Sequence, residues 1–273
     1  MGILKDKVAV VLGASAEGGT GWAIAEGLAA QGAKVVVAAR TFEPLERLAK
    51  KIGGHAVKCD GGSEADIRNL RDETIKTFGK IDIAVNSAAQ PVLSSIADSN
   101  QDTLNQGITV NYFGMVHFIR EMADAMKGPG SIITVSSMTA IQPSAPHFSY
   151  ACGKAAMECL VMYAAQEYGP RQIRVNCIRV GTVRSDMARA LYEKPGITER
   201  FEMEIPLGKM PEPEQIAHAA VFLADNPYMT GCHLDVSGGN QLARFPFMHE
   251  LPGAREAYAG SGPLASRESG NAF

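Results

Sequence analysis

The sequence is poor in the features that mark several classes of protein. Its five cysteines include no Cys-x-x-Cys pair, which favours free thiols in a reducing compartment over a disulfide framework. No grouping of histidine, cysteine and acidic residues has the spacing of a metal site, so we expect no bound metal. No apolar run is long enough to cross a membrane, and the first residues lack the apolar stretch of a signal peptide. We therefore expect a cytoplasmic protein.

Charge of one sign is not in excess either. The chain has 26 Lys and Arg against 29 Asp and Glu, a net charge of −3, with both signs scattered. This balance gives no electrostatic footprint for nucleic acid, and we expect neither a nucleic-acid nor a membrane partner. Apolar residues make up 46% of the 273 residues, which is enough for a sizeable core in one domain.

Short apolar runs alternate with helical segments along the whole chain, which predicts an α/β fold with a parallel sheet. We expect strands near residues 7–12, 34–39, 55–58, 81–85, 130–135, 173–178 and 232–236. We expect helices near residues 21–31, 43–52, 64–78, 100–126, 149–169, 185–203 and 213–224. The strands are apolar throughout, as when helices cover both faces. Such a sheet binds ligands at the carboxyl ends of its strands, where the strand order reverses.

A glycine-rich turn follows the first predicted strand. Residues 13–21 read Gly-Ala-Ser-Ala-Glu-Gly-Gly-Thr-Gly and are followed by a helical segment and a second strand. Glycines let the backbone approach a pyrophosphate, and the N-terminus of the helix attracts its charge. A tight turn without a ligand is the alternative, but the strand–turn–helix–strand context favours a dinucleotide site.

Tyr150 and Lys154 are four residues apart, so they share one face of a helix. A nearby cation lowers the pKa of a tyrosine from about 10, which helps the phenol exchange a proton with a ketone or an alcohol. Ser137 ends an apolar run and could hydrogen-bond the same oxygen; Ser136 is disfavoured because adjacent strand residues point to opposite faces. Chance could produce Tyr-x-x-x-Lys alone, but chance explains it less well beside the glycine turn.

With these motifs the chain resembles the short-chain dehydrogenase/reductase family, in the single-domain subgroup with a Tyr-x-x-x-Lys active site. The similarity covers about residues 5–243 and includes Asp60 after the third strand, residues 86–89 (Asn-Ser-Ala-Ala) after the fourth and Asn111. It implies a single doubly wound Rossmann domain over residues 1–243 with a seven-stranded parallel sheet. It also implies a homotetramer or homodimer in which the helices near 100–126 and 149–169 pair across a two-fold axis.

The resemblance implies a catalytic set of Asn111, Ser137, Tyr150 and Lys154. Tyr150 would act as general acid in reduction, Lys154 would lower its pKa and bind the nicotinamide ribose, and Ser137 would polarise the carbonyl. Asn111 would hold a water that links Lys154 to solvent; a structural amide that distorts its helix is the alternative. The implied cofactor-binding residues are Gly13, Ser15, Gly19, Thr20, Gly21, Arg40, Thr41, Asp60, Gly61, Asn86, Ala88, Tyr150, Lys154, Gly181, Val183 and Ser185.

The end of the second strand predicts which cofactor is used. An acidic residue here would bond the 2′-hydroxyl of NAD, whereas an arginine accommodates the 2′-phosphate of NADP. The chain has Ala39 followed by Arg40, and we therefore predict NADP, with NAD less favoured. A solvated arginine at a strand end is the alternative.

Several positions depart from the family pattern. The glycine turn is two residues longer than usual, Ala89 replaces a glycine, Val180 replaces a proline, and Ser185 stands where threonine is frequent. The longer turn leaves open which of residues 14–17 contact phosphate. It is also similar to the turn of bacterial enoyl reductases, but those space their Tyr and Lys more widely.

Substrate residues are less clearly indicated. Residues 182–211 are expected to form an apolar lid, with an ordinary core helix pair as the alternative. Candidate substrate contacts are Gln90, Met138, Gln142, His147, Val183 and Met187. The C-terminal extension, residues 244–273, carries Phe245, Phe247 and Tyr258 and is expected to dock across a subunit boundary and close part of the pocket. A strap lying on its own subunit is the alternative.

These features predict an NADP(H)-dependent oxidoreductase that interconverts a ketone and a secondary alcohol on a hydrophobic small molecule. Two other classes remain open. The first is an enzyme of different chemistry on this scaffold, such as a dehydratase or epimerase. The second is a nucleotide-binding regulator without turnover, against which the complete set of four catalytic residues argues.

Overall fold

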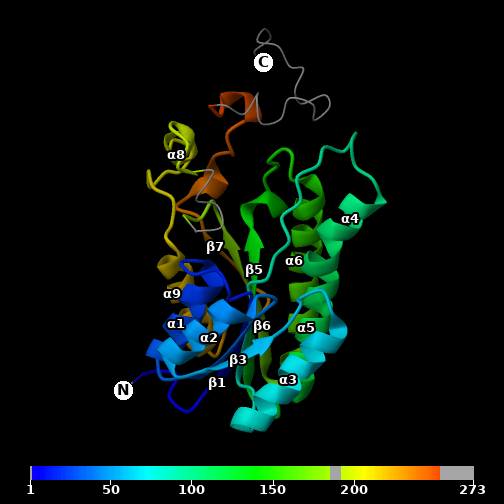
Figure 1. The fold of residues 1–273 in the computed structure, drawn as a ribbon, viewed down its shortest axis with the longest axis vertical. Helices are drawn as coiled ribbons and strands as arrows, with labels where there is room; N and C mark the ends of the chain where they lie inside the picture. The colour runs from blue at the N-terminus through cyan, green and yellow to red at the C-terminus, as the bar shows by residue number, and fades with distance from the viewer. Residues whose placement is uncertain (1, 185–191, 253–273) are drawn as a thin grey trace.

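The computed structural model describes residues 2–184 and 192–252, and its centre is one parallel β-sheet (Figure 1). The strands are β1 (Val8–Leu12), β2 (Lys34–Ala39), β3 (His55–Lys58), β4 (Ile83–Asn86), β5 (Gly130–Ser137), β6 (Ile173–Val180) and β7 (His233–Val236). Their order is β3-β2-β1-β4-β5-β6-β7, with all pairs parallel. The order reverses between β1 and β4, so a ligand site is expected above these two strands.

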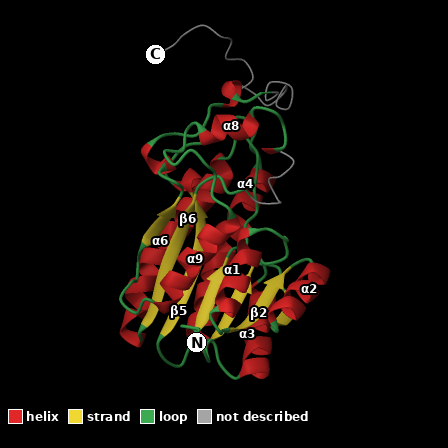
Figure 2. Cartoon of the chain, turned by 90° about the vertical axis from the view of Figure 1, so that its left-hand side faces the viewer, coloured by secondary structure: helices red, strands yellow, loops and turns green. Residues whose placement is uncertain are grey.

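Helices cover both faces of the sheet (Figures 1 and 2). They are α1 (Thr20–Ala30), α2 (Phe42–Ile52), α3 (Glu64–Phe78), α4 (Gln101–Ile108), α5 (Gly114–Ala125), α6 (Phe148–Tyr168), α8 (Ile197–Glu202) and α9 (Pro213–Asp225). Buried residues of α1, α2 and α9 form one core layer with one face of the sheet. Buried residues of α3, α5 and α6 form the second core layer on the opposite face. The doubly wound architecture predicted from the alternating pattern is confirmed.

The strands lie close to their predicted positions because the central ones are apolar runs buried on both sides. β1 and β4 have every residue buried, as expected for central parallel strands. Helix ends follow local signals: Ser63 accepts a hydrogen bond from the Asp66 amide at the start of α3, and Gly53 and Gly79 end α2 and α3 with positive φ. Such caps satisfy the backbone groups that a helix end leaves unpaired.

Two predicted helices differ from the structure. The segment near 100–126 is not one helix, because a π-helical turn, Thr109–Phe113, separates α4 from α5. Of the helix predicted over 185–203, the structure shows α8 (Ile197–Glu202), and residues 185–191 lie outside the described part. Within residues 2–184 and 192–252, none of the helices combines the length and apolar character needed to cross a bilayer.

Candidate active site

A trough runs along the carboxyl ends of the central strands and consists of two adjoining cavities. The larger, of about 350 Å³, is lined by residues from the glycine turn, the ends of β5 and β6, the start of α6 and the segments beyond β6 and β7. The smaller, of about 130 Å³, lies toward β2 and β3. Gly13, Ala16, Ser87 and Ala89 line both cavities, so one elongated ligand can occupy the two together.

The glycine turn is shaped by close backbone contacts. Gly13 has φ +92°, and a Cβ there would lie 2.4 Å from the Ala88 nitrogen. A Cβ on Gly21 would lie 2.2 Å from the Gly13 carbonyl oxygen, so the first turn of α1 packs directly on the end of β1. Only glycine fits these two positions.

The N-terminus of α1 fits a pyrophosphate. Gly19 is its N-cap and offers no side chain to accept from the first amides, and its first turn has no acidic residue. Free amides at a helix N-terminus bind anions through their hydrogens and the helix dipole. Gly19, Thr20 and Gly21 all line the larger cavity, which places this anion-binding end inside the trough.

The smaller cavity collects the residues predicted for the adenosine end of a dinucleotide. Ser15, Arg40, Thr41, Asp60, Gly61 and Ala88 line it. Arg40 is exposed, and within residues 2–184 and 192–252 it forms no ion pair. One carboxylate oxygen of Asp60 accepts from the Gly62 amide at 2.9 Å, which fixes that side chain at the end of β3.

Asn86 supports the trough from beneath. Its side chain is buried, and its Oδ1 accepts a hydrogen bond from the Ala88 amide at 3.0 Å. It lines neither cavity. The structure therefore gives Asn86 a role in holding the loop after β4 in place, and the predicted direct contact with cofactor is not seen in the cavity lining.

Ser137, Tyr150 and Lys154 meet at the larger cavity, as the motif predicts. β5 ends at Ser137, and the first turns of α6 carry Tyr150 and Lys154 on one face. The Lys154 ammonium is 2% exposed, lies 5.7 Å from the centroid of the Tyr150 ring and donates to the Val135 carbonyl oxygen at 2.8 Å. Ser136 also contributes to the lining, but its hydroxyl donates to the Glu158 carboxylate at 2.6 Å.

The pKa values of this pair differ from the sequence expectation. Burial raises the pKa of Tyr150 to about 12, although a hydrogen bond with Ser137 acts in the opposite direction. Burial lowers the pKa of Lys154 to about 8, and the nearby Cys177 and Glu158 oppose this only in part. The predicted lowering of the tyrosine pKa by Lys154 is therefore not found in this structure, because desolvation dominates for both groups.

Asn111 lies in the π-helical turn and is fully buried. Its Nδ2 donates to the carbonyl oxygens of Gln90 at 2.8 Å and Gly107 at 3.0 Å, and its Oδ1 accepts from the Gln90 amide at 3.2 Å. These bonds tie the loop after β4 to α4. These bonds are those of a structural amide, and the predicted role of Asn111 in holding a water stays a prediction; π-turns of this kind are frequent at functional sites.

A buried ionic network lies one turn beyond Lys154 on α6. Glu158 binds Arg179 of β6 through both carboxylate oxygens, at 3.0 and 2.7 Å, and Arg179 also binds Asp235 of β7 at 2.6 Å. Its members are far apart in the chain, so no motif or spacing in the sequence indicates the network. It fixes α6 against the sheet directly behind the Tyr150–Lys154 pair.

The structure places the predicted substrate residues in different surroundings. His147 and Val183 line the larger cavity. Met138 is fully buried in the core and Gln90 lies outside the lining, so neither prediction is supported. Gln142 instead donates to the carbonyl oxygens of Asn240 and Ala243, both at 3.0 Å. Met187 and Ser185 lie outside the described residues.

Three aromatic residues complete the cavity wall. Tyr192 and Phe201, in the predicted lid, and Phe245, in the C-terminal extension, all line the larger cavity. The extension up to residue 252 therefore lies on its own subunit and contributes to its own site. Residues 253–273, which include Tyr258, lie outside the described part, so the predicted docking across a subunit boundary stays a prediction.

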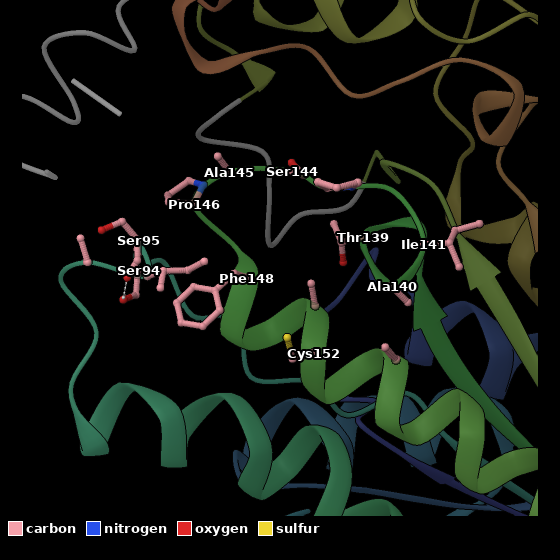
Figure 3. A pocket seen from close by; sticks show the side chains of 15 residues that line it. Ser94, Ser95, Thr139, Ala140, Ile141, Ser144, Ala145, Pro146, Phe148 and Cys152 are labelled. Carbon is pink, nitrogen blue, oxygen red and sulfur yellow. Dashed lines mark hydrogen bonds between the residues drawn. The ribbon is translucent and has the colours of Figure 1, made fainter. Parts of the chain in front are cut away.

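A separate cavity, of about 690 Å³, lies outside the trough and adjoins it (Figure 3). It lies between the loop after β4, the loop joining β5 to α6 and the first turns of α6, and its lining has no charged side chain among the described residues. Thr139 and Ser144 line both this cavity and the larger cavity of the trough. The loop that carries them is thus a thin wall between the two.

One face of α6 packs on the sheet and the other is exposed. Val161, Ala164 and Ala165 are buried in the protein's own core, and the predicted pairing of this helix across a two-fold axis stays a prediction. The exposed residues of this helix include Cys152, Ala155, Cys159, Met162 and Tyr163. Leu104 and Phe113, in the neighbouring helical segments, are exposed as well.

Comparison with known proteins agrees with this fold and site. The family model described as enoyl-(acyl carrier protein) reductase matches residues 13–241. The chain is 32% identical over 240 residues to a 3-oxoacyl-[acyl-carrier-protein] reductase of Mus musculus, covering 87% of this chain and 99% of the relative. It is 30% identical to tropinone reductase-like 3 of Erythroxylum coca, covering 85% of this chain and 92% of the relative.

A solved structure supports the same relationship. The short-chain type dehydrogenase/reductase of Mycobacterium marinum superposes with a TM-score of 0.81 at 32% identity, covering 87% of this chain and 96% of that one. Membership of one family accounts for the doubly wound sheet, the glycine turn at its switch point and the Ser137–Tyr150–Lys154 cluster. The chain belongs to the short-chain dehydrogenase/reductase family of nicotinamide-dinucleotide-dependent oxidoreductases.

Proposed function

We propose that the protein is an NADP(H)-dependent oxidoreductase that interconverts a ketone and a secondary alcohol on a hydrophobic small molecule. The observation that carries this proposal is the meeting of Ser137, Tyr150 and Lys154 in one cavity that continues into the Arg40 end of the trough. The names of its relatives, among them a 3-oxoacyl-[acyl-carrier-protein] reductase and a carbonyl reductase family member, favour carbonyl reduction.

In the proposed mechanism the protein positions the substrate oxygen and moves one proton. A nicotinamide cofactor, held by the glycine turn and the residues of the trough, would supply the hydride for reduction and accept it in oxidation. Ser137 donates a hydrogen bond to the carbonyl oxygen, and Tyr150 gives that oxygen its proton. Lys154 lies beside Tyr150, where its positive charge favours the developing phenolate. Asn111 would hold the π-turn through which a water connects Lys154 to solvent.

The protonation state of Tyr150 favours reduction in the absence of other ligands. With a pKa raised to about 12 by burial, the phenol keeps its proton throughout the neutral range and is ready to act as an acid. Alcohol oxidation needs the phenolate, which is scarce at pH 7 with such a pKa. A protonated phenol is the form that general-acid catalysis of ketone reduction requires.

The residues at the Arg40 end support NADP. Arg40 is exposed beside the smaller cavity, and Thr41 is the N-cap of α2 without a side-chain cap bond. A guanidinium and a free helix N-terminus both suit a 2′-phosphate. The carboxylates of Glu17 and Glu43 form ion pairs with Arg47 and not with Arg40.

Replacing Tyr150 by Phe tests the assignment. The ring still packs but cannot transfer a proton, so kcat for ketone reduction should fall by about 10²–10⁴-fold while NADPH binding is kept. Tyr163→Phe is the matched control, since this tyrosine lies on the same helix, is 68% exposed and faces away from the trough. A Tyr150→Phe enzyme with a near-normal rate would exclude Tyr150 as the acid.

The two other function classes make different predictions. A dehydratase or epimerase would convert its substrate without net consumption of NADPH, and a nucleotide-binding regulator would bind NADPH without any turnover. Measuring NADPH absorbance with a panel of ketones, and counting product per NADPH oxidised, separates the three. One alcohol formed per NADPH oxidised is the result that we expect.

We also propose a symmetric homo-oligomer, either a homodimer or a homotetramer, acting in the cytoplasm. Support for assembly comes from the exposed apolar face on α6 and the segments beside it, where Met162, Tyr163, Phe113 and Leu104 are each at least 40% exposed. Burying such a face on a second copy is the common outcome for soluble oligomers. Light scattering that finds a monomer at micromolar concentration would contradict this.

A further inference from the structure

One wall of the active-site cavity is aromatic and comes from two segments that are distant in sequence. Tyr192 and Phe201 lie beyond β6, with their rings 6.2 Å apart and nearly perpendicular. Phe245 lies beyond β7 and is 8% exposed. All three line the cavity that holds Tyr150 and His147, so a substrate at Tyr150 has rings beside it.

Alternating ion pairs join these two segments. Arg244 binds Glu250 through both carboxylate oxygens, at 2.7 and 2.8 Å, and binds Glu204 at 3.0 Å. Arg200, on α8 next to Phe201, binds Glu204 at 2.7 Å and Glu250 at 2.8 Å. The pairs close into a ring of two arginines and two glutamates. The hydrogen bond from Arg244 is the main reason that the pKa of Glu250 falls to about 2.

Further contacts hold the same segment in place. Asn240 donates to the carbonyl oxygens of Glu204 and Arg244, both at 3.2 Å. Gln142, in the loop that leads to Tyr150, donates to the Asn240 and Ala243 carbonyl oxygens. The backbone on either side of Phe245 is therefore fixed both to the lid segment and to the loop that precedes α6. We call residues 244–252 the aromatic strap.

The cavity suits a compact, uncharged ligand. Its volume of about 350 Å³ is near the lower end for small-molecule sites, and the nicotinamide end of the cofactor must share it. None of its described lining residues is Asp, Glu or Arg. Burial lowers the pKa of His147, which favours the neutral imidazole, and Lys154 is already bonded to Val135. Among the described lining residues, Lys154 is the one charged side chain that a charged substituent on the substrate would meet.

We propose that Phe245 is a specificity-determining residue that, with Tyr192 and Phe201, selects compact, neutral ketones carrying an alicyclic or aromatic ring next to the carbonyl over 3-oxoacyl thioesters. This inference rests on the proposed function. Aromatic side chains bury a ring over a large apolar area with defined stacked or edge contacts. A flexible acyl thioester loses more conformational freedom on binding, and Phe245 takes up part of the space beside Tyr150 that a long acyl chain would need.

Phe245 lies outside the region that the family model matches, whereas Tyr192 and Phe201 lie within it. The family model matches residues 13–241 and ends before the strap. The alignment with the Mus musculus 3-oxoacyl-[acyl-carrier-protein] reductase already covers 99% of that relative but 87% of this chain. The contribution of Phe245 to the cavity is therefore additional to the region that the family model describes.

The test compares Phe245→Ala with wild type on two probes, acetophenone and acetoacetyl-CoA, with NADPH. We expect wild type to prefer acetophenone, and Phe245→Ala to raise the KM for acetophenone about tenfold or more while kcat/KM for acetoacetyl-CoA stays equal or rises. Phe247→Ala is the control, because Phe247 lies in the same strap, is 58% exposed and does not line the cavity. Urea unfolding of each variant monitors folding.

A binding measurement separates this inference from the proposed function. Calorimetric titration of acetophenone into the protein with NADP⁺ should give a Kd about tenfold weaker in Phe245→Ala than in wild type. Ring binding that depends on Phe245 without any turnover would leave this inference intact and refute the proposed reaction. Turnover with equal effects of Phe245→Ala on both probes, or with none, would refute the role of Phe245 and leave the proposed reaction intact.

The ion-pair ring gives a second variant that leaves Phe245 in the chain. Glu250→Gln removes the charge that both Arg200 and Arg244 bind. We expect the KM for acetophenone to rise by a smaller factor than in Phe245→Ala, with kcat little changed, because the ring is less firmly placed but the reacting groups are untouched. An unchanged KM for Glu250→Gln would show that the ion pairs do not position the wall.

Discussion

Replacing Lys154 by Met should stabilise the cofactor-free protein at neutral pH while abolishing turnover. Lys154 is 2% exposed, and among the described residues its ammonium donates to one acceptor, the Val135 carbonyl oxygen. Burial lowers its pKa from 10.5 to about 8, a difference equivalent to about 3 kcal/mol of destabilisation at pH 7. Met has a similar unbranched shape and carries no charge, so the variant is relieved of that cost.

The substitution also removes a hydrogen bond, which reduces the gain. The Val135 carbonyl oxygen loses its donor, and an unsatisfied buried acceptor costs about 1–3 kcal/mol. The net expected stabilisation is therefore about 0–2 kcal/mol at pH 7. For a chain of this size, a gain of about 2 kcal/mol corresponds to a rise in Tm of about 4–8 °C.

The pH dependence identifies the cause of the gain. Because the folded-state pKa of Lys154 is below its unfolded value, the unfolded state binds more protons between about pH 8 and 10.5, and the wild type becomes more stable as pH rises through this range. The cost of the buried charge falls to about 2 kcal/mol at pH 9 and about 1 kcal/mol at pH 10 by the same linkage. The lost hydrogen bond is independent of pH, so the advantage of the variant should vanish near pH 9–10.

Urea unfolding of wild type and Lys154→Met at pH 7, 8, 9 and 10 measures this directly. Tyr150 does not interfere below pH 10, because its own pKa is raised to about 12 and it stays neutral in the folded protein. Lys51→Met is a control on the protein surface, since this lysine is exposed. A difference in unfolding free energy that is the same at all four pH values, or a variant less stable than wild type at pH 7, would refute the reasoning.

Three further expectations follow from other parts of the structure. Arg40→Asp should shift the ratio of kcat/KM for NADP against NAD by at least about tenfold toward NAD, since a carboxylate repels the 2′-phosphate; a wild type that already prefers NAD would contradict the interpretation of Arg40. Glu158→Gln should lower the unfolding free energy by about 3 kcal/mol in the same urea assay, because the buried charge of Arg179 loses the negative charge that balances it. Glu167→Gln, at an exposed position on the same helix, should have little effect. Deleting residues 244–273 should raise the KM for acetophenone and leave the Kd for NADPH close to that of wild type, because Phe245 lines the larger cavity and not the Arg40 end. An unchanged KM would show that the strap does not contribute to substrate binding.

The sheet was predictable because each strand is an apolar run that ends at a turn. β2 and β3 span the predicted residues, and the others agree to within a few residues. The glycine turn and the Tyr150–Lys154 pair were predictable for a related reason, since both are local patterns whose spacing determines their geometry. Ser137 could be preferred over Ser136 by strand alternation, and the hydrogen bond from Ser136 to Glu158 agrees with that preference.

Features that depend on long-range contacts could not be predicted in this way. The π-turn interrupts a segment with continuous helical propensity, and Asn111 bonds the backbone of Gln90, 21 residues earlier. Met138 directly follows Ser137, yet it turns into the core because a short 3-10 turn begins there. Phe245 is visible in the sequence as an aromatic residue in a proline-broken segment. Its place in the cavity, however, depends on the ion pairs that Arg244 and Glu250 form with residues 200 and 204, and no spacing in the sequence indicates these pairs.

The opposite pKa shifts of Tyr150 and Lys154 both result from burial, and they bear on how the proposed reaction is accelerated. Burial penalises the charged form of each group, so it raises the pKa of the phenol and lowers that of the ammonium. A phenolate formed by proton transfer to substrate would face the same penalty unless a positive charge compensates it. Lys154, held 5.7 Å from the ring centroid by its bond to Val135, is placed to provide that charge at the moment the phenolate appears. Its stabilisation is therefore greater after proton transfer than before, which is the condition for an interaction to accelerate a reaction.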